Sequence, residues 1–132
     1  MNQFYSTAQM NSLKGTITCT PKIGPIEYGL VAMLDVLDFA NTEIANSKRK
    51  TLPCIVQEGT KVVRVSETNN YHQKVYVLNF STDPDPKGQL PMEKKTFYET
   101  LLSYANYIGK DMEQVRLYLD FDGKTELLET DI

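Results

Sequence analysis

Two alternating runs of residues, joined by a polar turn, form the strongest pattern in the chain. They span Lys61–Asp83 (KVVRVSETNNYHQKVYVLNFSTD), and β-branched and aromatic residues fill both runs. Alternation with a period of two is typical of half-buried β-strands. Asn69 and Asn70 tolerate the positive φ of a tight turn. The pattern therefore predicts a β-hairpin.

Three other parts of the chain carry the same alternation. Ser12–Thr20 predicts one strand and Thr51–Gln57 a shorter one, with Glu58-Gly59 as the turn that leads into the hairpin. Residues 115–129 predict a closing hairpin, because Asp122-Gly123 is a strong signal for a two-residue turn.

The clearest helix is predicted over Pro91–Ile108. Its apolar residues recur at helical spacing and comprise Phe97, Leu101, Tyr104, Ala105 and Ile108. Gly109 is expected to end this helix. The preceding segment DPDPKGQLP, residues 83–91, predicts a connecting loop.

Two structures fit Ile26–Ile44. One apolar stripe indicates a helix and consists of Ile26, Leu30, Met33, Leu34, Leu37 and Ile44. A period of two indicates a long strand whose face would carry Tyr28, Leu30, Ala32, Leu34 and Val36. Gly29 disfavours a helix interior, and the flanking segments are β-like, so we favour the strand. In that case Lys48, Arg49 and Lys50 lie at a hairpin tip.

The order of these elements predicts a mainly β protein with one clear helix. Three strands, a helix and two strands follow the order of an OB-fold, a five-stranded antiparallel barrel, here with N-terminal additions. An open α+β sheet with its helices on one face is the alternative. Residues 1–11 are expected to form a flexible arm that carries Phe4 and Tyr5. Residues 12–132 are expected to form one OB-like domain with a short acidic C-terminal end.

Composition changes this picture little. The chain has 132 residues, 41% of them hydrophobic and 23% charged, which is ordinary for a soluble domain. Its formal net charge of -3 argues mildly against a polybasic binder. Cys19 and Cys54 lack C-x-x-C spacing, so we expect free thiols in a reducing compartment. No signal peptide or membrane-spanning run is recognisable, and we expect a cytoplasmic protein.

Catalytic signatures are absent from the sequence. None of the phosphate-binding, dinucleotide-binding, zinc-protease or serine-hydrolase motifs occurs. His72 is the only histidine, and one histidine with two separated cysteines does not supply a zinc site. We therefore expect no enzyme activity, no metal and no cofactor.

Tyrosines beside basic residues are the remaining chemical signal. Single-stranded nucleic acid is bound in this way, because Lys and Arg contact phosphates while bases stack on aromatic rings. The candidate nucleic-acid-binding residues are Lys48, Arg49, Lys50, Arg64, Tyr71, His72, Lys74, Tyr76, Arg116 and Tyr118.

The chain resembles small OB-fold single-stranded DNA-binding proteins of Gram-positive phages and conjugative plasmids. The resemblance lies in the strand order, the opening SLKGTITC, the aromatic and basic hairpin and the acidic end. This resemblance implies sequence-independent binding of single-stranded DNA in replication or transfer of a mobile element. Self-association, through the arm with Phe4 and Tyr5, is also expected. The alternative is a small phage or plasmid protein that inhibits or modulates a host protein.

Overall fold

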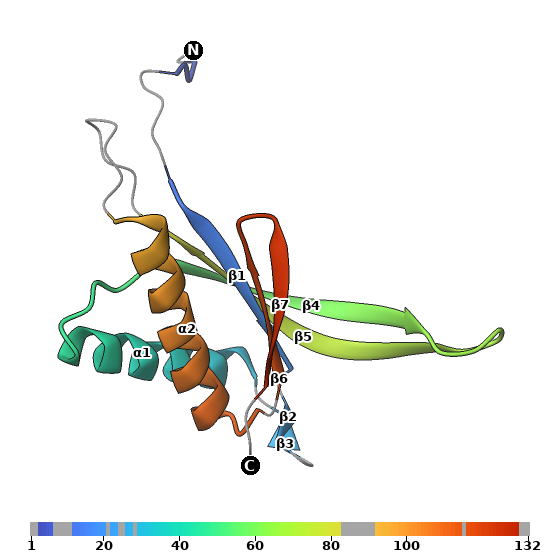
Figure 1. The fold of residues 1–132 in the computed structure, drawn as a ribbon. Coiled ribbons are helices and arrows are strands. Elements are labelled where there is room, and N and C mark those ends of the chain that lie inside the picture. Colours follow the sequence, from blue (N-terminus) through green and yellow to red (C-terminus); the bar gives the residue numbers. More distant parts are fainter. Residues whose placement is uncertain are drawn as a thin grey trace.

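Five strands form one antiparallel sheet in the order β4-β5-β1-β6-β7 (Figure 1). The computed structural model describes residues 3–6, 12–20, 22–23, 26–27, 29–82, 92–114 and 116–129. The strands of the sheet are β1 (Lys14–Cys19), β4 (Cys54–Arg64), β5 (Asn70–Ser81), β6 (Arg116–Phe121) and β7 (Lys124–Glu129). Two short strands, β2 (Lys22–Ile23) and β3 (Ile26–Glu27), pair with each other.

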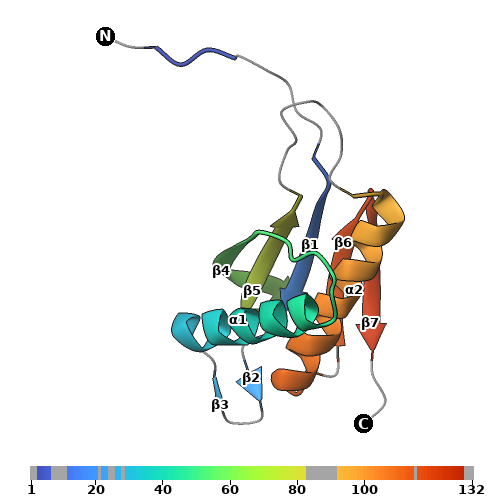
Figure 2. The ribbon, with the colours of Figure 1, turned by 90° about the vertical axis from the view of Figure 1, so that its left-hand side faces the viewer.

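Two helices, α1 (Leu30–Asn46) and α2 (Lys94–Asp111), lie on one face of this sheet (Figure 2). The order β1-α1-β4-β5-α2-β6 places β1 in the middle of the sheet, which is the ferredoxin-like βαββαβ arrangement with β7 added at one edge. Side chains between the helices and the sheet form the core, and its largest fully buried members include Tyr76, Tyr104, Phe80, Phe97 and Ile17.

The sheet is open, as the α+β alternative predicts. Its edge strands β4 and β7 do not pair with each other in the described residues, so the strands do not close into the barrel that was the first expectation. Two helices on the same face explain the difference, because they cover the apolar side that a barrel would enclose. The mainly β composition and the five antiparallel strands are confirmed.

Helix α1 replaces the strand that we favoured for Ile26–Ile44. Its buried side chains are Met33, Val36, Leu37, Ala40 and Ile44, which follow helical spacing and pack against the core. Gly29 does not lie inside the helix, since it is the N-cap residue. Leu30 and Leu34, which belonged to both predicted faces, are 45% and 43% exposed.

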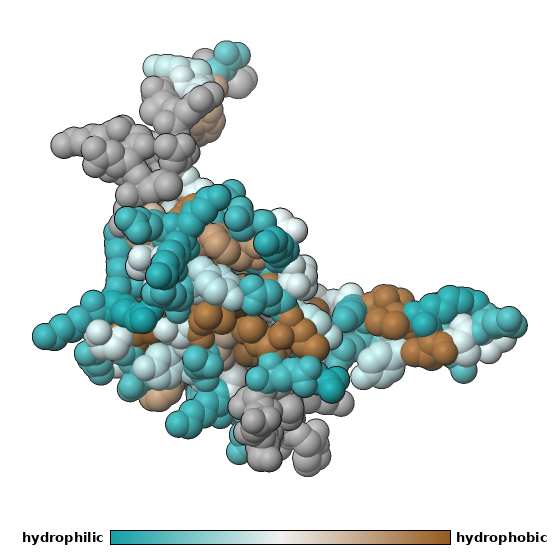
Figure 3. Space-filling view, in the orientation of Figure 1, coloured by the Kyte–Doolittle hydropathy of each residue, from teal (hydrophilic) through white to brown (hydrophobic). Residues whose placement is uncertain are grey.

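The predicted central hairpin is confirmed, but its first strand is longer than expected. Glu58 and Gly59 make no turn, because they pair with Tyr76 and Val75 inside one continuous strand β4. The hairpin extends away from both helices (Figure 1). Its surface is partly hydrophobic (Figure 3), and the exposed apolar side chains there include Val62, Val63 and Val65.

The other predicted elements are confirmed with shifted ends. The predicted helix is α2, and Gly109 lies inside it rather than after it. The closing hairpin turns at Asp122 and Gly123, whose φ values of 55° and 75° are those of a tight two-residue turn. The predicted loop over residues 83–91 lies outside the described residues. Within the part of the chain that is described, no helix is long and apolar enough to cross a membrane.

Candidate functional site

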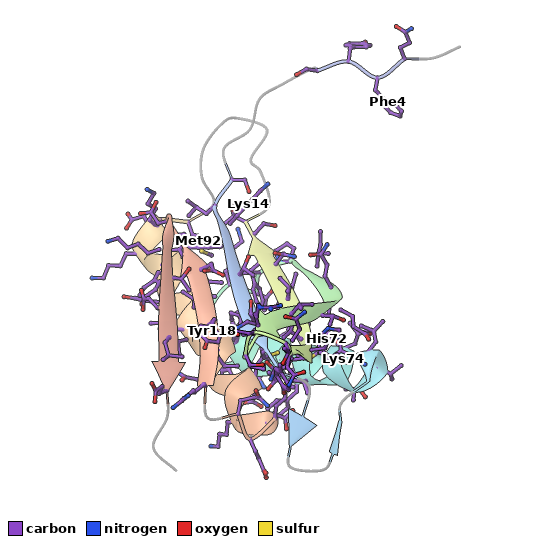
Figure 4. All side chains as sticks on the ribbon, turned by 90° about the vertical axis from the view of Figure 1, so that its right-hand side faces the viewer. Phe4, Lys14, His72, Lys74, Met92 and Tyr118 are labelled. Carbon is purple, nitrogen blue, oxygen red and sulfur yellow. The ribbon has the colours of Figure 1, made fainter. Side chains whose placement is uncertain are left out.

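The face of the sheet that the helices leave uncovered carries the polar side chains of the strands. On β1, Gly15, Ile17 and Cys19 point toward the helices, so Thr16 and Thr18 point to the opposite side. We call this side the open face. Figure 4 looks toward it, with Lys14 at one end and Tyr118 nearer the middle.

A row of hydrogen-bonded side chains crosses the open face. Thr16 Oγ1 donates to Asn79 Oδ1 at 3.1 Å, and Asn79 Nδ2 donates to Gln57 Oε1 at 2.9 Å. Thr16 is paired on its other side with Asp120, whose carboxylate accepts a hydrogen bond from Thr125 Oγ1. We call these five residues the polar row. Hydrogen bonds join Thr16, Asn79 and Gln57 in one group and Asp120 and Thr125 in another. The ionised Asp120 carboxylate can accept further hydrogen bonds from a ligand.

A shallow hollow of about 260 Å³ lies where β1 meets β6 and β7. Its lining includes Thr16, Asp120 and Thr125 of the polar row, together with Lys14 and Lys124. Charges of both signs therefore lie at this end of the open face.

The base of the hairpin lies at the other end of the open face. Lys61 on β4 places its ammonium 5.3 Å from the centre of the Tyr118 ring on β6, although β5 and β1 lie between these strands. Val75 also points to the open face, and it is only 7% exposed. We call Lys61, Val75 and Tyr118 the corner. Lys61 and Tyr118 are exposed and Val75 is buried, so the corner presents an ammonium, an aromatic ring and an apolar side chain.

Together these residues suit a small ligand with a flat ring and several hydroxyl groups. The corner supplies an aromatic ring and an apolar wall, and the polar row supplies a carboxylate, two amides and two hydroxyls. Small-molecule sites commonly combine apolar walls with a few placed polar groups in this way.

The two thiols, Cys19 buried and Cys54 partly buried, do not contribute a nucleophile to this site. Burial raises the pKa of Cys19 and of Cys54 to about 12, so both remain protonated thiols near neutral pH. Both point toward the helices rather than to the open face. Among the described residues, no group of three or more His, Cys, Asp or Glu side chains is placed to hold a metal ion.

Tyr118 is the only one of the ten residues predicted from the sequence that belongs to the corner. Tyr76 is fully buried in the core and offers no ring surface to a ligand. The Lys74 ammonium forms an ion pair with Glu58 at 2.9 Å and lies 5.9 Å from the centre of the Tyr76 ring.

The other predicted residues are dispersed over the surface. Arg116 lies 3.8 Å from the Glu129 carboxylate at the opposite edge of the sheet from β4. Arg64, Tyr71 and His72 lie exposed at the far end of the hairpin. Lys48, Arg49 and Lys50 are exposed after the end of α1, not at a hairpin tip. The ten residues therefore do not form one surface.

The N-terminal aromatic residues are exposed as well. Phe4 and Tyr5 lie in residues 3–6, which have no regular secondary structure, and Figure 4 shows Phe4 apart from the sheet. The self-association predicted through this segment gains no support from their placement.

Sequence reasoning missed the polar row and Lys61. Thr16, Asn79 and Asp120 each alternate with core residues along their strands, and this alternation was the available signal. It indicates which residues share a face of one strand. It does not indicate which strands lie side by side.

No protein-family model matches the chain, and no curated protein matches it, so no sequence relative tests the resemblance drawn from the sequence pattern. Among solved structures, phage SAM lyase in complex with S-methyl-5'-thioadenosine is similar to this chain. Its TM-score is 0.60 and its sequence identity is 10%, and the match covers 96% of this chain and 97% of that chain. Phage SAM lyase in the apo state matches with a TM-score of 0.59 and 9% identity over 99% of this chain and 98% of that chain. At this level of identity the likeness shows a shared fold.

These matches correct the function predicted from the sequence. The solved chains that share this fold over nearly their whole length are enzymes, and one holds S-methyl-5'-thioadenosine rather than single-stranded DNA. The predictions of a non-catalytic protein, of DNA as its partner and of a role in replication are therefore wrong. The alternative of a non-catalytic inhibitor of a host protein is corrected for the same reason.

Proposed function

We propose that this chain is a SAM lyase, which binds S-adenosylmethionine on the open face and cleaves it to S-methyl-5'-thioadenosine. The observation that carries the proposal is the fold shared with phage SAM lyase across nearly the full length of both chains. The chemistry of the corner and the polar row supports it, because these residues suit a nucleoside.

The proposed reaction breaks one carbon–sulfur bond. The sulfur of S-adenosylmethionine is a sulfonium, bonded to three carbons and positively charged. The substrate's own carboxylate oxygen attacks the γ-carbon of the methionine chain, and the electron pair of the broken bond stays on sulfur. The products are S-methyl-5'-thioadenosine and homoserine lactone. Atoms and charge balance without a water molecule or a transferred proton.

Such a reaction requires positioning more than acid–base catalysis. The protein must hold the methionine chain so that the carboxylate oxygen approaches the γ-carbon in line with the carbon–sulfur bond. Two opposite charges disappear in this step, so exclusion of water lowers its barrier. Val75 in the corner supplies an apolar side chain next to where the sulfur would lie. The absence of a histidine or thiolate from the open face among the described residues is compatible with this chemistry.

The residues proposed to contact the two ends of the thioribose lie on one strand. Tyr118 and Asp120 lie on the same face of β6 two residues apart, which places them about 7 Å from each other along the strand. In the proposed pose the sulfur lies against the Tyr118 ring and the Asp120 carboxylate accepts hydrogen bonds from the ribose. The amides of Gln57 and Asn79 are then available to the adenine ring.

A product assay tests the proposal. The purified chain is incubated with S-adenosylmethionine, and S-methyl-5'-thioadenosine and homoserine lactone are quantified by mass spectrometry against a protein-free sample. We expect both products in equal amounts, at a rate above that of the uncatalysed breakdown. Calorimetric titration with S-adenosylmethionine measures binding separately. A chain that neither binds the substrate nor raises the rate contradicts the proposal.

We place this activity in the cytoplasm. Cys19 and Cys54 are both free thiols, and free thiols persist in a reducing compartment.

A further inference from the structure

The face of the Tyr118 ring is already in contact with a positive charge. The Lys61 ammonium lies 5.3 Å from the ring centre, which is within the range of a cation–π interaction. Among the described residues, no carboxylate lies within ion-pair distance of Lys61. Tyr118 itself is 42% exposed, so a ligand can reach its ring. Among the described residues, the Tyr118 ring is therefore the interaction partner of the Lys61 ammonium.

A sulfonium resembles the cations that bind to aromatic rings. Like a quaternary ammonium, it is a compact positive charge surrounded by alkyl groups, and such ions are recognised by aromatic faces. The ammonium of Lys61 and a sulfonium cannot both lie against the same ring face, because their like charges repel each other.

We propose that Lys61 occupies the position on the Tyr118 ring that the substrate sulfonium takes, and that Lys61 competes with the substrate for it. This inference rests on the proposed function for the identity of the ligand. A lysine is suited to such a role, since its flexible four-carbon stem lets the ammonium move into solvent when the sulfonium arrives.

The competition also favours release of the product. When the carbon–sulfur bond breaks, the sulfur becomes a neutral thioether and its attraction to the ring falls. The Lys61 ammonium then returns to the ring face. Lys61 is in this way a specificity-determining residue, because it lets a cationic sulfur displace it more readily than a neutral one.

Substitution of Lys61 tests the competition directly. Lys61→Met removes the charge and keeps much of the side-chain volume, and binding of S-adenosylmethionine is measured by calorimetric titration. Loss of a competing cation–π contact should tighten binding by about two- to fivefold. Lys61→Arg retains a competing cation and should bind like the unaltered chain. Lys95→Met, at an exposed position on α2, makes the same change in net charge on the helix side of the sheet and should leave binding unchanged. Equal or weaker binding by Lys61→Met overturns the proposal.

A second probe separates this inference from the proposed function. Trimethylsulfonium contains the charged sulfur without the nucleoside, and its contact with the ring is followed through the NMR signals of the Tyr118 ring protons. These signals should shift at lower trimethylsulfonium concentration in Lys61→Met than in the unaltered chain. No shift in Lys61→Met overturns the inference even if the lyase reaction is observed. A shift without formation of S-methyl-5'-thioadenosine supports the cation site and rejects the lyase.

Discussion

The hydroxyl of Tyr104 on α2 donates a hydrogen bond to Asn41 Oδ1 on α1 and accepts one from the backbone N–H of Leu52 at 2.9 Å. The Tyr104 side chain is fully buried, and its ring centre lies 4.6 Å from that of Phe80 on β5. One side chain therefore joins both helices, the sheet and the segment that leads into β4.

Loss of this hydroxyl should destabilise the fold. Tyr104→Phe keeps the ring in the core but leaves the buried N–H of Leu52 without its acceptor, at a cost of about 1–3 kcal/mol. Urea unfolding followed by circular dichroism measures the change. Tyr107→Phe is the matched control, because the Tyr107 hydroxyl takes part in no hydrogen bond within the described residues. Equal stability of Tyr104→Phe and the unaltered chain would show that the two hydrogen bonds contribute nothing.

Gly15 should not tolerate a side chain. A Cβ atom at this position on β1 would lie 2.4 Å from Leu101 Cδ1 and 3.3 Å from Phe97 Cε1, both fully buried on α2. Gly15→Ala forces these side chains to move, and we expect a loss of about 1–3 kcal/mol of unfolding free energy. The control is Gly59→Ala on β4. A Cβ atom there would lie 3.7 Å from the nearest atom, Val75 Cγ2, which is an ordinary contact distance. Stability should therefore be kept or slightly raised. Thermal unfolding of the two variants decides between these outcomes.

The Asp120 carboxylate should matter for the proposed ligand. Asp120→Asn keeps the size and part of the hydrogen bonding of the polar row but removes the negative charge that accepts the ribose hydroxyls. We expect roughly ten- to hundredfold weaker binding of S-adenosylmethionine, since a hydrogen bond to a charged group contributes about 1.5–3 kcal/mol. Calorimetric titration provides the measurement. Asp35→Asn, at an exposed position on α1, is the control, because it makes the same change in net charge away from the open face. Unchanged affinity in Asp120→Asn would remove this carboxylate from the proposed site.

Stability should fall at alkaline pH because of Cys19. Burial raises the pKa of this thiol from 9.0 to about 12 in the folded chain. Above pH 9 the unfolded chain loses the thiol proton while the folded chain keeps it, so the stabilisation present below pH 9 is lost progressively up to about pH 12. Cys19→Ala should flatten the decline. Unfolding free energies of both chains between pH 7 and 11 test this, and parallel curves would contradict it.

Local pattern was a sound guide to the elements and a poor guide to the site. Tyr76 and Tyr118 both looked like accessible rings beside basic residues. In the folded chain Tyr76 is opposite Cys19 in the core, whereas Tyr118 is opposite Thr18 on the open face. The charges of Lys74 and Arg116 lie near Glu58 and Glu129 on neighbouring strands. These partners explain why the predicted basic surface does not form.

The segment that became α1 shows where the sequence pattern was ambiguous. Apolar residues in Ile26–Ile44 satisfied both a helical and an alternating period. The helix is formed because Met33, Leu37 and Ile44 then bury together against the core. A long-range packing preference therefore decided a choice that local periodicity left open.

By itself, the sequence determined the strands β1, β5, β6 and β7, most of helix α2 and the turn at Asp122 and Gly123. These features depend on side-chain periodicity and on backbone conformations that neighbouring residues control. Only the tertiary structure decided that the sheet is open and that the polar row and the corner exist. Thr16 and Asn79 are 63 residues apart in the chain, and Lys61 reaches Tyr118 across two intervening strands. Strand order places such residues together, and no local pattern in the sequence specifies strand order.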